Sequence, residues 1–508
     1  MERDPSTLRA NAQYAVHALV HHPGAPLIVI DGLSLTVADI ARVGAEGATG
    51  PQGLQIAESA RAAAAGSSAF AHRTALERPI YGRSTGVGAN RNIPLVAGDS
   101  GHTAAALLRS HATSAGPLRS PRRVRAMLLV RLNQLAAGGS GADPALLDAV
   151  VGLLESGALP PVREHGSIGT GDLSALAVTA LTLQGELPVG STPRFRFQIS
   201  DALPFISSNA AAIADAALAL AELQRLADAA LVVAALTFVG VDGNGEAFSE
   251  AVEHVTPFPG AQRVCAAFRS LVDGHAQPTR IQDPFGLRVL PQVHGVFFDG
   301  LTALERVIVL MANAPSENPV LSPEIGMAHH GGFHAAYLAQ ALDAVALAAA
   351  QSAQLSLARL KMLTEPALTG LPAFLGDGTP GASGIMIVEY VTASAVAGLL
   401  ATPASLQSVT LSRGVEEDAS FASLAAVKVL QAVGLYRTAL AGELVAAVRA
   451  IRLKGGRLPE ALTGVGRAAD VLDPEMEDRD LTADIASAEL LLDDLVPLPS
   501  AGGRGPSA

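Results

Sequence analysis

The sequence predicts a mainly α-helical protein, built as a long helical bundle with a smaller, loop-rich N-terminal domain. From about residue 53 onward, Ala- and Leu-rich segments with helical periodicity dominate the chain. Several of these segments are much longer than an ordinary globular helix, and their alanine content lets neighbouring helices approach closely. Short strands and loops are expected only at the periphery.

The first regular element is expected at residues 27–40, where an apolar strand, a turn at Asp31 and Gly32, and a helix initiated by Thr36 follow one another. Later helices are expected over 53–77, 102–116, 121–137, 144–156, 172–184, 208–239, 299–314, 333–364, 382–400 and 420–450. We divide the chain into a flexible N-terminus (1–26), an N-terminal domain with the active-site loop (27–200), a helical bundle domain (201–495) and a disordered tail (496–508).

Composition narrows the class of protein. The 508 residues carry a formal net charge of −12 and no basic run, which argues against nucleic acid or an anionic membrane as partner. The apolar stretches 210–239 and 333–360 are interrupted by charges and are interpreted as buried helices, not membrane spans. The N-terminus lacks the order of a signal peptide, so we expect a cytoplasmic protein. Cys265, the single cysteine, is interpreted as buried filler. No metal is expected, because the histidines at 329, 330 and 334 have no acidic or cysteine motif around them.

The stretch 160–184 runs from a glycine-rich loop directly into an apolar helical pattern. Gly169, Thr170 and Gly171 lie where the chain enters a helix headed by Asp172 or Ser174. Free N–H groups and the positive end of the helix dipole suit a developing anion or an electron-poor group there. The two glycines also leave room for an amide nitrogen to approach a carbonyl. The alternative interpretation is a well-capped helix start.

Other loops and one predicted helix carry further candidates. Tyr81 opens the loop 81–92 and is either a general base, which needs a lowered pKa, or a structural hydrogen-bonding group. Arg288 is either a carboxylate clamp or an ordinary surface arginine. The remaining candidates have equally ordinary alternatives as core, turn or solvated residues: His111, Gln282, Asn318 and Glu417.

Taken together and in order, nine motifs resemble the aromatic amino acid ammonia-lyase family, and its histidine ammonia-lyase branch most closely. They are YGRSTGVG (81–88), Ser110-His111, RLNQLAAGGSG (131–141), GSIGTGDLSALA (166–177), QDPFGLRVLPQV (282–293), SENP (316–319), GGFH (331–334), GLPAFL (370–375) and EED (416–418).

The resemblance implies an aspartase/fumarase-like helical fold, a homotetramer, and ammonia elimination from an α-amino acid. It also implies a 4-methylideneimidazol-5-one (MIO) electrophile made from an internal Ala-Ser-Gly without an external cofactor. By match of motif, Tyr81 is the base and Arg288 the carboxylate clamp. Of the other matching residues, His111 and Glu417 select a polar aromatic side chain, and the following line the site: Gln282, Asn318 and Phe333.

The departures from the family pattern lie where the chemistry is. Gly169-Thr170-Gly171 replaces Ala-Ser-Gly in a motif one residue shorter. Attack of the Gly171 nitrogen on the Gly169 carbonyl and loss of the Thr170 hydroxyl would leave an ethylidene instead of a methylidene. The triplet 166–168 is a worse candidate, because β-branched Ile168 crowds the ring-closing nitrogen. The partner residues differ as well: Phe285 replaces a tyrosine, Ser207 or Asn209 an asparagine, and Gly332 another asparagine.

Three functions therefore remain open. The chain is a carbon–nitrogen lyase or aminomutase with a Thr-derived electrophile; or an enzyme on the same scaffold that performs another elimination, isomerisation, cyclisation or conjugate addition on a carboxylate-bearing small molecule; or a non-catalytic binding homologue. Retention of Tyr81 and Arg288 favours the two enzymes, because a binding protein needs no proton acceptor.

Overall fold

The computed structural model describes residues 27–45, 53–95, 98, 100–187, 189–190, 194–275, 278, 280–400, 402–455 and 457–495. The expected flexible N-terminus (1–26) and disordered tail (496–508) lie outside these residues. Within them the chain forms two compact units: one from the residues up to Leu218 with Val307–Ala339 and Ala404–Ala426, the other from the remainder. The domain boundary expected at residue 200 stays a prediction.

The first unit holds seven of the described helices and three small sheets. Its helices are α2 (Val37–Ala45), α3 (Glu58–Glu77), α4 (Ser100–His111), α5 (Pro121–Ala136), α6 (Ala145–Ser156), α7 (Leu173–Gln184) and α8 (Ile199–Ile206). Its two-stranded sheets pair β1 (Ile28–Ile30) with β2 (Leu54–Ile56) in parallel, and β3 (Ala115–Leu118) with β4 (Arg163–His165) and β5 (Val320–Ser322) with β6 (Gly326–Ala328) antiparallel.

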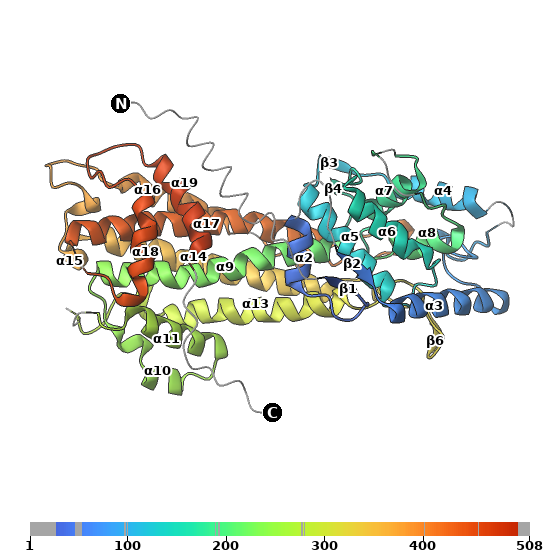
Figure 1. Ribbon diagram of the computed structural model, residues 1–508, viewed down its shortest axis with the longest axis horizontal. Coiled ribbons are helices and arrows are strands. Elements are labelled where there is room, and N and C mark those ends of the chain that lie inside the picture. The colour runs from blue at the N-terminus through green and yellow to red at the C-terminus, as the bar shows by residue number, and fades with distance from the viewer. Residues whose placement is uncertain are drawn as a thin grey trace. The chain divides into compact units, whose positions relative to one another are not determined.

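The core of the second unit is made by four long helices, which Figure 1 draws running alongside one another. They are α9 (Ala210–Gly240), α13 (Leu290–Ala312), α14 (Ala336–Thr364) and α17 (Ala422–Lys454), each with its larger part in this unit. Buried polar contacts join them, because polar groups removed from water need partners. In α17, Glu443 accepts hydrogen bonds from Thr237 of α9 at 2.8 Å and from Arg359 of α14 at 2.6 Å.

Shorter helices complete the second unit. They are α10 (Glu250–Val255), α11 (Pro259–Val272), α12 (Phe285–Arg288), α15 (Pro366–Thr369), α16 (Met386–Gly398), α18 (Thr463–Ala468) and α19 (Thr482–Leu491). Cys265 lies buried in α11. Among the described residues, three helical stretches are long and apolar enough to cross a membrane by length and composition alone: Ile199–Gly240, Ala336–Thr364 and Ala422–Lys454.

The predicted mainly α-helical class is confirmed, and the boundaries of three predicted helices differ most from the structure. The helix expected from residue 299 begins nine residues earlier, at Leu290, as α13. Residues 54–56 form β2 before α3 begins, because this short apolar run pairs with β1. Helix α4 ends at His111, and residues 115–118 form β3. Thr36 does start α2: its hydroxyl accepts the N–H of Asp39 at 3.1 Å, and the Asp39 carboxylate accepts the N–H of Thr36 at 3.2 Å.

Candidate functional site

The loop before α7 adopts a backbone conformation that depends on glycine. Gly169 has φ +85° and Gly171 has φ +113°, values that residues with a β-carbon rarely adopt. A β-carbon on Gly169 would lie 2.2 Å from the hydroxyl oxygen of Ser420 and 2.7 Å from the backbone nitrogen of Ala422. Residue 169 is therefore restricted to glycine by its neighbours as well as by its dihedral angle.

The two peptide groups that would react in a ring closure have matched partners. The carbonyl oxygen of Gly169 accepts two hydrogen bonds, from the Ser420 hydroxyl at 2.7 Å and from the Ala335 N–H at 3.2 Å. The N–H of Gly171 donates to the side-chain oxygen of Asn209 at 3.2 Å. The amide nitrogen of Asn209 donates to the carbonyl of Phe333 at 2.6 Å, which is consistent with the assigned orientation of the side-chain amide. The carbonyl is thus polarised by two donors, while the nitrogen faces an acceptor.

Asp172 is the residue before α7, as expected, but its side chain does not cap that helix. Its carboxylate accepts the N–H of Ala212 at 2.8 Å, in the first turn of α9, where N–H groups lack intrahelical partners. The backbone N–H of Asp172 donates to the carbonyl of Ser208 at 2.6 Å. Burial raises the pKa of this fully enclosed carboxyl. The expectation that Asp172 caps its own helix is wrong, because α9 lies within reach.

Tyr81 begins a tightly folded loop. The N–H of Gly86 donates to the carbonyl of Ile93 at 2.9 Å, and the N–H of Gly88 donates to the Tyr81 hydroxyl at 2.7 Å. Burial raises the pKa of Tyr81 above its ordinary value; the Gly88 hydrogen bond opposes this effect without cancelling it. The lowered pKa that a general base needs is therefore not a property of this chain by itself.

The segment 329–335 contacts two loops. One is the loop that begins at Tyr81 (81–92, the tyrosine loop), and the other is the loop before α7 (166–171, the glycine loop). The backbone N–H of Tyr81 donates to the imidazole of His329 at 3.2 Å, and the two rings meet edge to face with centroids 6.5 Å apart. Six residues later, Ala335 donates to Gly169 and Phe333 accepts from Asn209. This one segment therefore links the tyrosine loop to the glycine loop.

The segment 411–423 also contacts both loops. Its Ser412 hydroxyl accepts the N–H of Ala89, in the tyrosine loop, at 3.1 Å. Further along, the N–H of Phe421 donates to the carbonyl of Ile168 at 2.8 Å, next to the contact of Ser420 with Gly169. All these residues belong to the first unit, so one compact part of the chain holds Tyr81 and the triplet 169–171 around common neighbours.

The sequence matches one protein family over most of its length. The model of the aromatic amino acid lyase family matches residues 35–470. Histidine ammonia-lyase of Anaeromyxobacter sp. (strain K) is 33% identical over 505 residues, which cover 92% of this chain and 98% of that protein. This chain belongs to the aromatic amino acid lyase family. It is accordingly a lyase by family.

Solved structures agree on the helical fold of the family. Tyrosine aminomutase from Streptomyces globisporus matches with a TM-score of 0.84 and 25% identity over 92% of this chain and 97% of that one. Histidine ammonia-lyase from Trypanosoma cruzi matches with a TM-score of 0.83 and 25% identity over 92% and 94%. An ergothionase from Treponema denticola, at 23% identity over 93% and 100% with a TM-score of 0.87, shows the fold alone.

Three residues of the motif 282–293 cluster in the second unit. The guanidinium of Arg288 donates to the side-chain oxygen of Gln282 and lies 4.7 Å from the ring centroid of Phe285. Phe285 is 63% exposed and Gln282 is also exposed, so this cluster faces outward from its unit. The family resemblance implies sites lined by several subunits, and the convergence of Arg288 with Tyr81 from different subunits at the start of α7 stays a prediction.

Other expected site residues lie in the first unit with partners of their own. The side-chain oxygen of Asn318 accepts the N–H of His330 at 2.9 Å, and Asn318 lines the same small hollow as Tyr81. His111 ends α4, where its ring contacts the Leu107 carbonyl at 2.9 Å. Two further expected residues differ in burial: Glu417 is exposed, and Ser207 is buried.

The sequence left open whether Ser207 or Asn209 contacts the glycine loop, and it did not indicate a role for Ser420. Of Ser207 and Asn209, it is Asn209 whose side chain contacts the glycine loop. Ser420 was not singled out, although it stands two residues after the acidic run 416–418. Its contact with Gly169 spans 251 positions of the chain, and a sequence pattern carries no signal at that separation. The main-chain donor Ala335 follows the GGFH motif directly.

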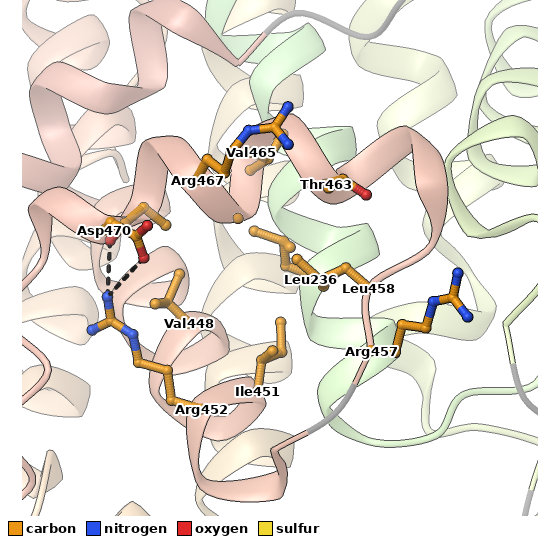
Figure 2. A pocket seen from close by; sticks show the side chains of 12 residues that line it. Leu236, Val448, Ile451, Arg452, Arg457, Leu458, Thr463, Val465, Arg467 and Asp470 are labelled. Carbon is orange, nitrogen blue, oxygen red and sulfur yellow. Dashed lines mark hydrogen bonds and ion pairs between the residues drawn. The ribbon is translucent and has the colours of Figure 1, made fainter.

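A pocket in the second unit does not have the character of a catalytic site. Leu236, Val448 and Ile451 face the hollow, whereas the guanidinium groups of Arg457 and Arg467 point away from it (Figure 2). The guanidinium of Arg452 donates to the carbonyl of Ala469 at 3.1 Å and lies 4.0 Å from the carboxylate of Asp470. Across the described residues, no group of three or more His, Cys, Asp or Glu side chains is arranged to hold a metal ion.

Proposed function

We propose that this chain is a carbon–nitrogen lyase or aminomutase that acts on an α-amino acid with a polar aromatic side chain, histidine-like or tyrosine-like. The observation that carries the proposal is the pairing around residues 169–171, where a doubly hydrogen-bonded carbonyl precedes an N–H that faces an acceptor. The named activities of the relatives, histidine ammonia-lyase and tyrosine aminomutase, support the substrate class. We propose a cytoplasmic homotetramer.

The electrophile of this site is formed from the chain itself, without an external cofactor. Gly169, Thr170 and Gly171 fit its formation: the first has a polarised carbonyl, the second a β-hydroxyl to lose, and the third an N–H beside an acceptor. When formed, the group supplies an electron-poor centre that takes up the amine or the ring of the substrate. The ethylidene methyl from Thr170 hinders attack on that centre, so a lower rate is expected than with a methylidene.

Tyr81 removes the β-proton of the substrate. The hydrogen bond that Gly88 donates to the Tyr81 hydroxyl stabilises the phenolate form that this role requires. Arg288, contributed by a neighbouring subunit, binds the substrate carboxylate. The side-chain selectivity residues are His111 and Glu417, and the walls are formed by Ser207, Gln282, Phe285, Asn318 and Phe333.

Turnover tests this proposal. The purified chain is incubated with L-histidine and with L-tyrosine, and formation of the α,β-unsaturated or β-amino acid is followed by absorbance and chromatography. Tyr81→Phe is expected to lower kcat at least about 100-fold, because it removes the proton acceptor. Tyr390→Phe, which removes the hydroxyl of an exposed tyrosine in α16, is the matched control. Equal turnover by Tyr81→Phe, or no product from either amino acid, would rule the proposal out.

A second candidate is favoured by the electrostatics of Tyr81. Burial moves the pKa of Tyr81 further above neutral, so its phenol stays protonated at neutral pH and is available as a hydrogen-bond or proton donor. A family enzyme of this kind works without the electrophile and performs another elimination, isomerisation, cyclisation or conjugate addition on a carboxylate-bearing small molecule. A chain that turns over such a substrate at its full unmodified mass would establish this candidate over the first.

A further inference from the structure

We propose that Ser420 is a catalytic residue for the chain's own ring closure, acting with the Ala335 N–H as an oxyanion hole for the carbonyl oxygen of Gly169. The inference rests on the proposed function, because it concerns how the electrophile forms. It assigns a role to Ser420, which lies far from the triplet in the sequence. That role, formation of the electrophile, can be measured separately from substrate turnover.

The first support is the position of the Ser420 hydroxyl. It donates to the Gly169 carbonyl at 2.7 Å from a side chain that is 4% exposed. The hydroxyl also accepts the N–H of Ala422 at 3.3 Å, so its oxygen is held from a second direction. A preoriented donor in a water-excluded place stabilises charge more strongly than one that water competes with. The Ala335 N–H at 3.2 Å supplies the second donor to the same oxygen.

The second support is the way in which the segment 420–423 holds the loop. Three successive loop carbonyls receive hydrogen bonds from it: Ser167 from the Ser423 hydroxyl at 3.0 Å, Ile168 from the Phe421 N–H at 2.8 Å, and Gly169 from Ser420. Of these carbonyls, that of Gly169 alone belongs to the triplet that closes. The other two contacts therefore fix the loop, and the Ser420 contact bears on the reacting bond.

The third support is the nitrogen that attacks. The N–H of Gly171 points to the side-chain oxygen of Asn209, whose own amide is tied to Phe333. An acceptor on this N–H draws its proton away from nitrogen and increases the electron density available for attack. Donors at the carbonyl and an acceptor at the amide thus act on the two partners of one bond.

The closure balances with the atoms of the triplet. The Gly171 nitrogen bonds to the Gly169 carbon, the carbonyl electron pair moves to oxygen, and that oxygen takes the Gly171 proton. It leaves as water with the N–H proton of Thr170. The Thr170 hydroxyl and the Thr170 α-proton leave as the second water. No oxidant or reductant is required. Negative charge develops on the Gly169 oxygen in the first step, which is where Ser420 donates.

Mass spectrometry of matched variants tests the inference. Freshly synthesised wild type, Ser420→Ala, Ser420→Cys and Ser423→Ala are sampled over time for the fraction of chains lighter by two waters. We expect Ser420→Ala to form that species about 100-fold more slowly, as for loss of one oxyanion-hole donor. Ser420→Cys, similar in size but a weak donor, should be intermediate. Ser423→Ala removes a hydroxyl of the same segment and should close like wild type.

The outcomes distinguish a failure of the catalytic role of Ser420 from a failure of the proposed function. If wild type closes and Ser420→Ala closes equally fast, this inference fails and the proposed function stands. If Ser423→Ala is slowed as much as Ser420→Ala, the segment acts by holding the loop and the catalytic role of Ser420 is overturned. If wild type keeps its full mass, the proposed electrophile fails and the inference fails with it. Circular dichroism of each variant shows whether it is folded.

Discussion

At the scale of single residues, Gly169 is the position that the surroundings restrict most clearly. The family pattern that this chain resembles has alanine at the start of the triplet, but here a β-carbon would meet the Ser420 hydroxyl and the main chain at 421–422. In this shorter loop, residue 169 therefore has to be glycine. Thr170 keeps the β-hydroxyl that closure requires, while Gly169 lets the segment 420–423 come close.

Gly169→Ala is expected to destabilise the first unit and to prevent closure. Gly378→Ala is the matched control, because Gly378 has a similar positive φ of +94° but nothing within 4 Å of the added carbon. The control should cost about 1 kcal/mol from the left-handed conformation alone. Gly169→Ala should cost clearly more, measured by denaturant unfolding, and should keep its full mass. Equal effects of the two substitutions would show that the close contacts at Gly169 are unimportant.

The raised pKa of Tyr81 predicts the pH dependence of turnover. Below that pKa the phenolate fraction rises about tenfold per pH unit, so kcat/KM should rise steadily between pH 7 and pH 9. Glu416 contributes to the raised value through its negative charge, so Glu416→Gln should move the profile to lower pH. A profile that is flat over this range, or that Glu416→Gln leaves in place, would contradict Tyr81 as the base.

The sequence predicted some of these residues and not others, for physical reasons. Gly169 and Gly171 were identifiable because the absence of a β-carbon is a local property. Asp172 was assigned the wrong partner, because any capping rule considers the helix that follows and the true partner is Ala212 in α9. Ser420 was missed because its contact is made by tertiary folding alone.

At the scale of elements, the strand pair β3–β4 leads into the glycine loop and is held by an ion cluster. Arg123 contacts the carboxylates of Glu164 in β4 at 2.6 Å and of Asp215 in α9 at 2.7 Å. Burial acts to raise the pKa of Glu164, but the hydrogen-bonded Arg123 more than offsets it, and the pKa lies below its ordinary value. The ion pair thus ties the start of the loop to a long helix.

Glu164→Gln is expected to destabilise the protein at neutral pH by about 1–2 kcal/mol, because it removes the charge of one partner from a partly buried ion pair. Because the folded-state pKa of Glu164 is lowered, its contribution is present above the unfolded-state pKa and is lost as pH falls through the folded-state value. The difference between variant and wild type should therefore shrink below about pH 4. Asp148→Asn, which breaks an exposed pair with Arg61, should cost less than about 1 kcal/mol. A pH-independent difference for Glu164→Gln would contradict this account.

Helix periodicity predicted three of the four long helices well, missed the first nine residues of α13, and predicted the short strands poorly. The four long helices carry apolar residues over many turns, so the signal accumulates along each of them. By contrast, β2 and β3 have three and four residues, and their strand conformation depends on pairing with β1 and β4. Neither partner is visible in a local pattern, and for that reason both strands were assigned to neighbouring helices.

At the scale of the whole molecule, the second unit exposes large apolar side chains on two helices. Leu347 of α14 is 63% exposed, and Ile387 of α16 is 65% exposed. Self-association to the proposed homotetramer would remove such side chains from water. Composition alone shows that apolar residues are abundant, but not which of them remain uncovered after folding.

Leu347→Glu is expected to weaken self-association, because a buried unpaired charge is costly at an interface. Light scattering should show a smaller particle than for wild type, and circular dichroism should show an unchanged helix content. Turnover should fall with it, because the proposed substrate clamp, Arg288, comes from a neighbouring subunit. A variant that associates like wild type would show that Leu347 lies outside the subunit interface.

The most direct test of the central claim is the mass of the peptide that contains residues 169–171, isolated from the purified wild-type chain. The account predicts that this peptide is lighter by two waters and that fragmentation assigns the loss to Gly169-Thr170-Gly171. A peptide at its full, unmodified mass would contradict the claim that this chain makes its own electrophile.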